Sequence, residues 1–476
     1  MSLEPNKVFL ARSDICDYST GHRVDIPELD SAGELNTPLV LLRNLMCDAG
    51  LDNANYGTAK WNPMGDVIQQ GQQVVIKPNW VLDYNQGPIQ DTECLITHTS
   101  LLEAILRYVL KAMPEQITIC DAPIQSCNFD HLCEVSKIYE VVEKYKGGET
   151  DIIVKDLRMT RLPDSIYEDS EATCRDISQY CLFNLKENSV LEDITQEKTE
   201  FRVTYYDPDT LREHHCPGKH EYLVAKEIME ADVLISVPKL KTHKKAGITG
   251  ALKNLVGING FKEYLPHHRK GGSLRGGDCY EGGSVLKKIA EDIADKANKA
   301  TSRFARLLGF QSLWVIGRII STLGRDPSID GSWYGNDTVW RMCLDLQRIV
   351  HYGTSACKLS DRPQRKIITI TDAIVAGQGN GPLAPDPVPL GILSMGTCVA
   401  AIDYVHCFLI GLDPEKIPLV RYSFSQDIRS IAAFAPDQVE PVIDGVAIPI
   451  DQLYSQLGRT FDLPRGWVGH CELAYR

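Results

Sequence analysis

Short runs of β-branched and other apolar residues recur along the chain, and each run is followed by a polar turn and an amphipathic helix. Uninterrupted runs such as VLISV, in which no polar residue alternates, indicate strands that are covered on both faces. This alternation of strand and helix predicts an α/β fold with a mostly parallel sheet and helices on both of its faces. The strands predicted most clearly are VVIKPN from Val74, ITICDAP from Ile117, DIIVKDL from Asp151, DVLISVPK from Asp232 and IITITDA from Ile367.

The helices between these strands have apolar positions three or four residues apart. The segment Ser100–Met113 (SLLEAILRYVLKAM) is the clearest example. Thr99 and Ser100 precede its first apolar residues, and hydroxyl side chains are favoured at helix N-caps. We therefore expect these two residues to cap the helix.

Two apolar stretches invite a membrane assignment. Residues 389–412 contain Asp403 and His406, and they predict a buried strand (GILSM), a turn and a helix (CVAAIDYVHCFLIGL). Residues 307–323 are too few and carry Arg318. Because a spanning helix needs about 20 predominantly apolar residues, no transmembrane helix is predicted.

Two segments depart from the strand–helix pattern. Residues 158–222 are polar and rich in carboxylates, and they include a predicted strand pair in the stretch that begins FRVTYY at Phe201. Residues 284–353 begin with a long helical stretch and end with a loop that leads into another helix. The predicted organisation is an N-terminal α/β part (1–157), a polar insertion (158–222), a core part with a basic loop (223–283), a helical insertion (284–353) and a C-terminal part that completes the core (354–476).

Composition limits the classes of partner. The 476 residues are 43% hydrophobic and carry a formal net charge of −13, so the surface as a whole repels nucleic acid, and no nucleic-acid partner is expected. Any anion site must therefore be a local concentration of cations. The 15 cysteines include no CxxC pair, and the N-terminal residues lack a signal-peptide pattern. We expect reduced thiols and a cytoplasmic location.

Polar side chains follow four of the predicted strands. Lys77 and Asn79 follow the first, Asp121 the second, the segment Lys239–Lys245 the fourth and Asp372 the fifth. Ligands of open α/β sheets bind beyond the carboxyl ends of the strands. We therefore expect these side chains to line one crevice.

The most basic of these segments is Lys239–Lys245 (KLKTHKK), which we interpret as a loop after a buried strand. Gly247 and Gly250 then lead into a short helix, ALKNLVG. Cations before a helix N-terminus, with small residues that let the backbone approach, suit a phosphate or carboxylate. The GxxxxGK[ST] order of a P-loop is absent, so nucleoside triphosphate hydrolysis gains no support. The plainer alternative is a solvated basic turn.

These observations give a set of candidate site residues for a small anionic metabolite. Those expected to act in catalysis are Asp372, Asp121, Lys77, His243 and Lys253, and those expected to bind the substrate or its anionic group are Lys239, Lys241, Thr242, Lys244, Asn79, Asn254, Gly379, Asn380 and Gly381. Lys253 lies in an apolar stretch, where its amine is either a base or imine-forming group of lowered pKa or the tip of a side chain that extends to solvent.

The cofactor is unknown from the sequence, and two metal hypotheses stay open beside a divalent ion. Cys120, Cys127 and Cys133 are candidate ligands of an iron–sulfur cluster, although their spacing differs from the ferredoxin run and buried small residues are the default interpretation. His214, His215, Cys216 and His220 form an HHCxxxH pattern, which we interpret as surface histidines rather than a metal site.

Residues 284–324 combine basic and apolar side chains at helical spacing. Seven lysines and arginines alternate with apolar residues that include Phe304, Leu308 and Trp314. Such a pattern is compatible with peripheral contact with an anionic membrane or a partner helix. The alternative is a helix packed on its own domain.

The motifs resemble the family known as domain of unknown function 362. The resemblance rests on VPKLKTHKKAGITGALKNLVG from Val237, on DAIVAGQGNGP from Asp372 and on GxxxAAxDYVxxFLIGLDPEKIP from Gly396, with VVIKPN and CDAP in support. It implies shared positions at Lys77, Asn79, Asp121, Lys239, Lys241, His243, Lys253, Asn254, Asp372, Gly379, Asn380, Gly381 and Asp403. Many members carry ferredoxin-like cysteine modules. This chain has no CxxCxxC run, so an iron–sulfur assignment does not follow from the resemblance.

Three hypotheses of function remain. The first is an enzyme that acts on a small phosphorylated or carboxylated metabolite held by the basic loop. The second is a non-catalytic protein that docks on a membrane or partner of a cell-envelope or polysaccharide pathway. The third is an iron–sulfur redox protein.

Overall fold

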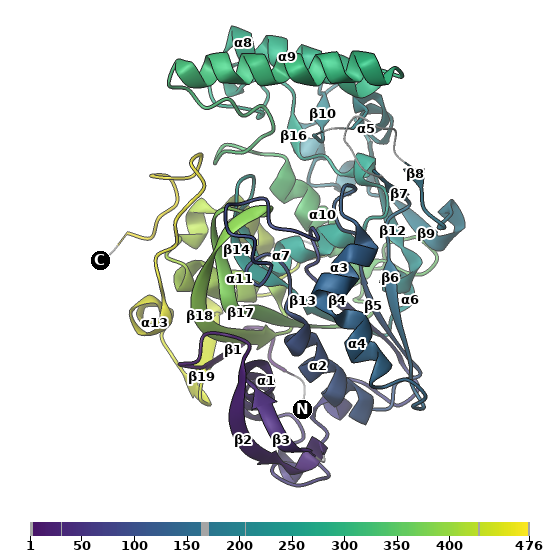
Figure 1. Cartoon of the computed structure of the whole chain (residues 1–476), viewed down its shortest axis with the longest axis vertical. Coiled ribbons are helices and arrows are strands. Elements are labelled where there is room, and N and C mark those ends of the chain that lie inside the picture. Colours follow the sequence, from purple (N-terminus) through teal and green to yellow (C-terminus); the bar gives the residue numbers. More distant parts are fainter. Residues whose placement is uncertain (1–2, 30, 163–170, 205, 427–428, 475–476) are drawn as a thin grey trace.

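The computed structural model describes residues 3–29, 31–162, 171–204, 206–426 and 429–474. A mixed sheet of 11 strands, mostly parallel, runs through these residues, and helices pack on it (Figure 1). The chain is therefore an α/β protein, as the hydrophobic pattern predicts.

The parallel half of the sheet contains all five predicted strands. Its order is β17-β13-β4-β5-β6, and each neighbouring pair is parallel. All five residues of β13 are buried, which confirms the interpretation of VLISV as a strand covered on both faces. The bounds are β4 Gln73–Pro78, β5 Gln116–Asp121, β6 Asp151–Asp156, β13 Val233–Val237 and β17 Lys366–Asn380.

The other half of the sheet is mixed. A long hairpin joins β17 to the antiparallel β18, which contains the predicted GILSM strand, and β1 lies next to β18. The sheet ends with β19, parallel to β1, and β20. The bounds are β1 Lys7–Arg12, β18 Ala384–Gly396, β19 Glu440–Ile443 and β20 Val446–Ala447.

Helices cover both faces of the sheet. One hydrophobic core contains residues of α1, α2, α3 and α4, and the other contains residues of α7, α10 and α11. These two cores confirm the predicted arrangement of helices on both faces. The bounds are α1 Thr37–Asp48, α2 Thr99–Lys111, α3 Phe129–Ser136, α4 Ile138–Glu143, α7 Ala251–Asn254, α10 Val339–Tyr352 and α11 Val399–Leu409.

The basic segment is not the loop that we expected. Residues Lys239–His243 form strand β14, which pairs parallel with β17 and antiparallel with β15 (Gly247–Thr249). The glycine-rich segment 376–380 is also part of a strand, β17. In both places the backbone continues to pair beyond the point where the apolar run stops.

The N-cap of α2 also differs from the prediction. His98 occupies the cap, and its ring Nδ1 accepts a hydrogen bond from the backbone N–H of Ser100 at 3.2 Å. Thr99 and Ser100 are the first helical residues instead. The imidazole nitrogen supplies the acceptor that a hydroxyl was expected to provide.

The polar insertion is only partly the strand pair that we predicted. β11 and β12 form a hairpin and β12 pairs with β9, but β10 pairs with β16 and residues 208–214 are helical. Residues 163–170 and 205 of this insertion lie outside the described residues. The bounds are β7 Thr160–Arg161, β8 Glu171–Ala172, β9 Tyr180–Asn184, β10 Phe201–Arg202, α5 Pro208–His214, β11 His215–Cys216, β12 Lys219–Ala225 and β16 His268–Arg269.

The helical insertion forms a hairpin of α8 (Val285–Lys299) and α9 (Arg303–Thr322). It lies across the end of the molecule opposite the β2–β3 hairpin (Figure 1). Among the described helices none has the length and apolar character needed to cross a membrane. The remaining elements are β2 Thr20–Ile26, β3 Ser31–Asn36, α6 Lys226–Glu230, α12 Pro418–Arg421 and α13 Ile450–Leu457.

Candidate functional site

Lys239 of β14 is held in a buried ion pair. Its Nζ lies 2.8 Å from Asp372 Oδ2 and donates to the hydroxyl of Tyr18 at 2.7 Å, and both charged side chains are fully buried. The Tyr18 hydroxyl donates in turn to Asp372 Oδ1 at 2.6 Å. The backbone N–H of His98 donates to Asp372 Oδ2 at 3.0 Å. Every charged group here has a partner. These contacts therefore connect β14 to β17 and stabilise their pairing.

Lys77 and Asp121 form a second buried ion pair at the ends of β4 and β5. Lys77 Nζ lies 2.8 Å from Asp121 Oδ1, and the backbone N–H of Trp80 donates to Asp121 Oδ2 at 2.7 Å. Burial raises the pKa of Asp121, and the charge of Lys77 opposes that rise. Gly257 packs against the pair so closely that an added Cβ would lie 2.0 Å from Asp121 Oδ1.

Two asparagines connect this pair to helix α7. Asn79 Nδ2 donates to Asn254 Oδ1 at 3.3 Å, and Asn254 Nδ2 donates to the Lys77 carbonyl at 3.1 Å and to Ser236 Oγ at 2.9 Å. Asn79 Oδ1 is buried without a hydrogen-bond partner among the described residues. The predicted residues Lys77, Asn79 and Asn254 therefore do meet in space.

Lys241 is fully buried, and its amine donates to the backbone carbonyl of Leu95. Burial and the nearby charge of Lys239 lower the pKa of Lys241 to about 7. An amine with this pKa is partly neutral at physiological pH.

His243 has a fixed tautomer. Its Nδ1 accepts hydrogen bonds from the backbone N–H groups of Lys245 at 2.9 Å and Ala246 at 3.1 Å, so the ring proton lies on Nε2. Burial, followed by the charges of Lys253 and Lys245, holds the pKa of His243 well below its ordinary value. The adjacent Thr242 uses its hydroxyl to donate to the Gly379 carbonyl at 3.0 Å, which ties β14 to β17.

Lys253 is the least satisfied of the predicted cations. Its side chain is partly exposed, and the described residues offer its amine no hydrogen-bond or ion-pair partner. Burial lowers the pKa of Lys253, and the charge of Lys245 lowers it further. The Lys245 Nζ itself lies 3.7 Å from Asp330 Oδ2, an ion pair at the long end of the range.

His243 therefore lies in a group of lysine and histidine side chains, which we call the basic cluster. His267 belongs to it as a neutral ring, since burial and the nearby charges of Lys245 and Lys253 hold its pKa well below the ordinary value. The members of the basic cluster are Lys241, His243, Lys245, Lys253 and His267. With Asp330 as the carboxylate that pairs with Lys245, the cluster carries more positive than negative charge, so it favours an anion.

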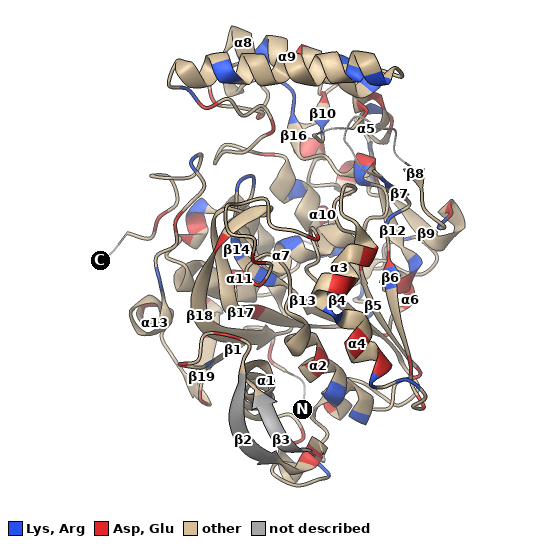
Figure 2. Cartoon of the chain, viewed as in Figure 1, with Lys and Arg blue, Asp and Glu red and all other residues tan. Residues whose placement is uncertain are grey.

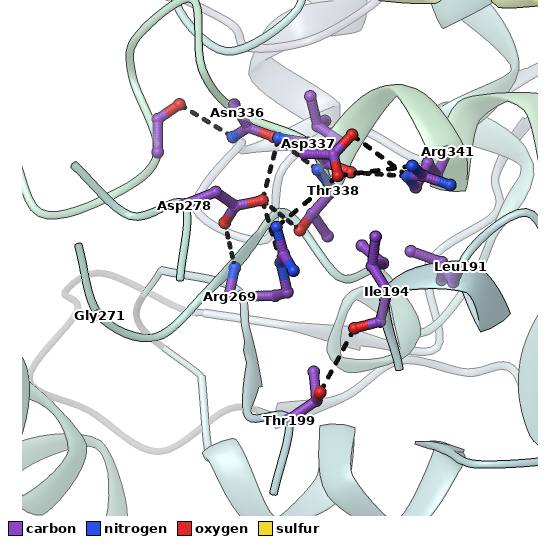
Figure 3. Close-up of polar contacts among 12 residues, drawn as sticks. Leu191, Ile194, Thr199, Arg269, Gly271, Asp278, Asn336, Asp337, Thr338 and Arg341 are labelled. Atoms are coloured by element: carbon purple, nitrogen blue, oxygen red, sulfur yellow. Dashed lines mark hydrogen bonds and ion pairs between the residues drawn. The ribbon is translucent and has the colours of Figure 1, made fainter. Parts of the chain in front are cut away.

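The position of His267 and His268 depends on Asp278. Asp278 Oδ2 accepts from the Thr338 hydroxyl at 2.6 Å and from the Asp337 backbone N–H at 3.0 Å, and Asp278 Oδ1 accepts from the Arg269 backbone N–H (Figure 3). The side-chain amide of Asn336 donates to the His267 carbonyl at 2.9 Å. These contacts join the histidine segment to the start of α10.

The end of the β17–β18 hairpin borders a cavity of about 730 Å³. Lys244 and Asn380 of the predicted site line this cavity, together with Asp330 and residues of the helical insertion. Gly381 packs on β14, where an added Cβ would lie 2.0 Å from the Thr242 carbonyl oxygen. Gly379 has a positive φ of 74°, which favours glycine.

A hydrogen-bonded Ser–His–Asp chain lies at the start of α7, and of its three residues only Asp403 is among the positions that the resemblance implies. Ser394 Oγ lies 2.8 Å from His406 Nε2, and His406 Nδ1 lies 3.0 Å from Asp403 Oδ1. All three side chains are at most 1% exposed. Asp403 also accepts from the backbone N–H groups of Ala251 and Leu252 at 2.8 Å, which fixes the first turn of α7. Its burial makes this chain a structural support of α7.

The structure gives the metal hypotheses no support. Among the described residues no three His, Cys, Asp or Glu side chains gather as a metal site would require. Cys120 lies in the core on one face of the sheet, whereas Cys127 and Cys133 lie in the core on the opposite face. Burial also raises the pKa of all three thiols, which disfavours the thiolate that a metal needs.

The interpretation of the HHCxxxH pattern as surface histidines is wrong for two of its residues. His215 and His220 are at most 1% exposed, and their Nδ1 atoms lie 3.2 Å apart. His215 Nε2 contacts the Tyr264 carbonyl and His220 Nε2 contacts Glu192. The β11–β12 hairpin turns both rings inward.

Residues 182–408 match the family model described as "Domain of unknown function (DUF362)", which confirms the resemblance of the lysine and glycine-rich motifs. β4 and β5, with Lys77 and Asp121, precede the matched segment. A thylakoid-associated protein of Synechocystis sp. is 24% identical over 219 residues, which are 46% of this chain and 43% of that protein. The chain thus spans less than half the length of this curated relative.

One solved structure aligns with a larger part of the chain. A crystal structure of a Thermotoga maritima protein aligns with 74% of this chain and 56% of its own, at 10% identity and a TM-score of 0.32. A similarity at this level supports no argument about this chain.

The sequence-based prediction missed the residues that surround the predicted ones. Tyr18 pairs with Lys239 across 221 positions of the chain. Asp330, the partner of Lys245, lies in the helical insertion. No local pattern marks either residue, since each acts through a partner distant in sequence.

Proposed function

We propose that this protein is an enzyme that binds a small anionic metabolite, phosphorylated or carboxylated, at the basic cluster. The observation that carries the proposal is Lys253, a residue that is only partly buried and whose amine has a lowered pKa and no partner among the described residues. A cation in such surroundings is stabilised when an anion supplies the missing countercharge.

The proposed roles follow from the contacts. Lys245 and Lys253 are the cations that would bind the anionic group directly. The neutral ring of His243 would donate a hydrogen bond from Nε2, because its Nδ1 is occupied by two backbone N–H groups. The buried pairs Lys239–Asp372 and Lys77–Asp121 hold β14 and β4 in place beneath this group.

A thermal-shift screen of phosphorylated and carboxylated metabolites tests the proposal. A metabolite that binds should raise the melting temperature of the wild type, and Lys253→Met should abolish the shift while Lys198→Met, at an exposed lysine, should retain it. A shift that Lys253→Met and Lys245→Met leave unchanged would place the anion elsewhere.

A second candidate function is peripheral docking on an anionic membrane through residues 284–324. Helix α9 exposes several large apolar side chains, of which Phe304 and Trp314 are the most exposed at 68% and 63%, and Leu323, which directly follows the helix, is 61% exposed. The helix carries arginines but no acidic residue, in a chain of net charge −13 (Figure 2). The name of the thylakoid-associated relative adds support.

Flotation with vesicles tests this candidate. The wild type should float with vesicles that contain anionic phospholipid and not with neutral ones. Phe304→Asp with Trp314→Asp should stay at the bottom of the gradient, and Gln311→Asp, at an exposed polar position of the same helix, should reduce flotation less. Equal behaviour of all variants would contradict membrane docking through α9.

A further inference from the structure

A second cavity, of about 480 Å³, lies between α9 and the body of the protein. Its α9 side is apolar and includes Phe310, Leu313 and Ile320, and Ala290 and Ala294 of α8 line it as well. A volume of this size is in the range of small-molecule binding sites.

The opposite side of the cavity is polar, and most of its charges are already paired. Arg202 Nε lies 2.8 Å from Asp295 Oδ1, and Lys270 Nζ lies 2.7 Å from Asp295 Oδ2. Two atoms at this side have no hydrogen-bond partner among the described residues: His268 Nδ1 and Asp330 Oδ1. His268 is 4% exposed, and its Nδ1 is a buried polar atom behind the wall of the cavity.

The polar end of the cavity adjoins the basic cluster. His268, which lines the cavity, directly follows His267 of the cluster in the chain. Lys245 Nζ lies 3.4 Å from Thr204 Oγ1 and 3.7 Å from Asp330 Oδ2, and both of these partners line the cavity. A molecule with its anionic group at Lys245 is therefore positioned to extend beneath α9.

We propose that the hollow beneath α9 binds the hydrocarbon chain of the anionic ligand, so that the substrate class is a single-chain amphiphile with an anionic head. This inference rests on the proposed anion site for the head and adds the chain site to it. The apolar wall from α9 would contact the chain, and the His268 and Lys245 side would contact the head.

The test compares the binding of octyl phosphate, butyl phosphate and inorganic phosphate to the full chain by isothermal titration calorimetry. Transfer of a methylene from water to an apolar site is worth about fourfold in affinity, so the four additional methylenes of octyl phosphate should tighten its binding by up to about 250-fold relative to butyl phosphate. Equal affinities for the two alkyl phosphates, or no binding of octyl phosphate, would overturn the inference.

Gly317→Leu is the variant that fills the hollow. Gly317 lines the cavity, and an added Cβ would have its nearest contact at 3.8 Å from Pro327 Cβ, so the larger side chain is accommodated. Leucine also favours a helix more than glycine does, so the variant should fold. It should remove the preference for octyl phosphate and leave butyl phosphate unchanged, whereas Val315→Leu, at a 49% exposed position of α9, should keep the preference.

The two proposals fail in different ways. If the preference for octyl phosphate persists in Gly317→Leu, the chain site is wrong even when Lys253→Met still weakens every phosphate. If instead Gly317→Leu removes the preference but Lys253→Met and Lys245→Met change nothing, the hollow binds a chain while the anionic head and the proposed function are wrong.

Discussion

Lys239 and Asp372 form an ion pair of 2.8 Å with both side chains fully buried, and Tyr18 bridges the two groups. The pair joins β14 to β17, where Lys239 and Asp372 lie opposite each other in the strand register. Removal of one partner would leave an uncompensated charge in the sheet, which is far more costly than the loss of both.

We therefore predict that Lys239→Met and Asp372→Asn each lower the free energy of unfolding by about 3–5 kcal/mol. The double variant Lys239→Met with Asp372→Asn should lose less than the sum of the two single losses, because it leaves no buried charge. Urea denaturation followed by circular dichroism measures these differences. Additive losses would show that the two groups do not interact.

Gly257 is predicted to be intolerant of any side chain. A Cβ there would lie 2.0 Å from Asp121 Oδ1 and 2.7 Å from Lys77 Nζ, so Gly257→Ala should separate the ion pair. The expected loss is about 1–3 kcal/mol, as for overpacked cores. Gly283→Ala is the control, since its nearest contacts are 3.7 Å away and its φ is not positive. Equal melting temperatures of the two variants would contradict this account.

Stability should rise with pH above neutrality because of Lys241 and Lys262. Burial lowers the pKa of each to about 7, from the ordinary value of 10.5. Between these values the unfolded chain binds more protons than the folded chain, so unfolding becomes less favourable as pH rises, by at most about 1.4 kcal/mol per pH unit for each lysine.

Urea denaturation at pH 7, 8 and 9 measures this dependence. Lys241→Met should reduce the slope relative to the wild type, while Lys198→Met, at an exposed lysine, should not change it. An unchanged slope in Lys241→Met would show that Lys241 is not the titrating group.

The Ser394–His406–Asp403 chain should not act as a hydrolase triad. Ser394 is 1% exposed, so a fluorophosphonate probe should not label the native protein at this residue. Asp403→Ala should lower stability by about 1–2 kcal/mol, because α7 loses the acceptor of two backbone N–H groups. Mass spectrometry that finds labelled Ser394 in the native protein would reverse this assignment.

The strands of the parallel half could be predicted because an apolar run and the polar residue that ends it are both local signals. The prediction of a loop at β14 was wrong because it relied on the many charged residues of this segment and not on their alternation with other residues. KLKTH in fact alternates, and alternate residues of a strand share a face, so Lys239, Lys241 and His243 point to one side.

The electrostatic state of the site could not be predicted from the sequence. The partners of Lys239 and Lys245, namely Tyr18 and Asp330, lie far from them in the chain. Only the folded structure shows that Lys239 and Lys245 have ion-pair partners, whereas Lys253 has none among the described residues. The sequence likewise shows the basic and apolar pattern of α9. It does not show which of the apolar side chains of α9 remain exposed in the folded protein.

The most direct test of the central claim is the affinity of the full chain for inorganic phosphate at pH 7, measured by isothermal titration calorimetry for the wild type, Lys253→Met and Lys198→Met. The account predicts binding by the wild type and by Lys198→Met, and a loss of about tenfold or more in Lys253→Met, since a hydrogen bond to a charged group contributes about 1.5–3 kcal/mol. Equal affinities of the wild type and Lys253→Met, or no binding by the wild type, would contradict it.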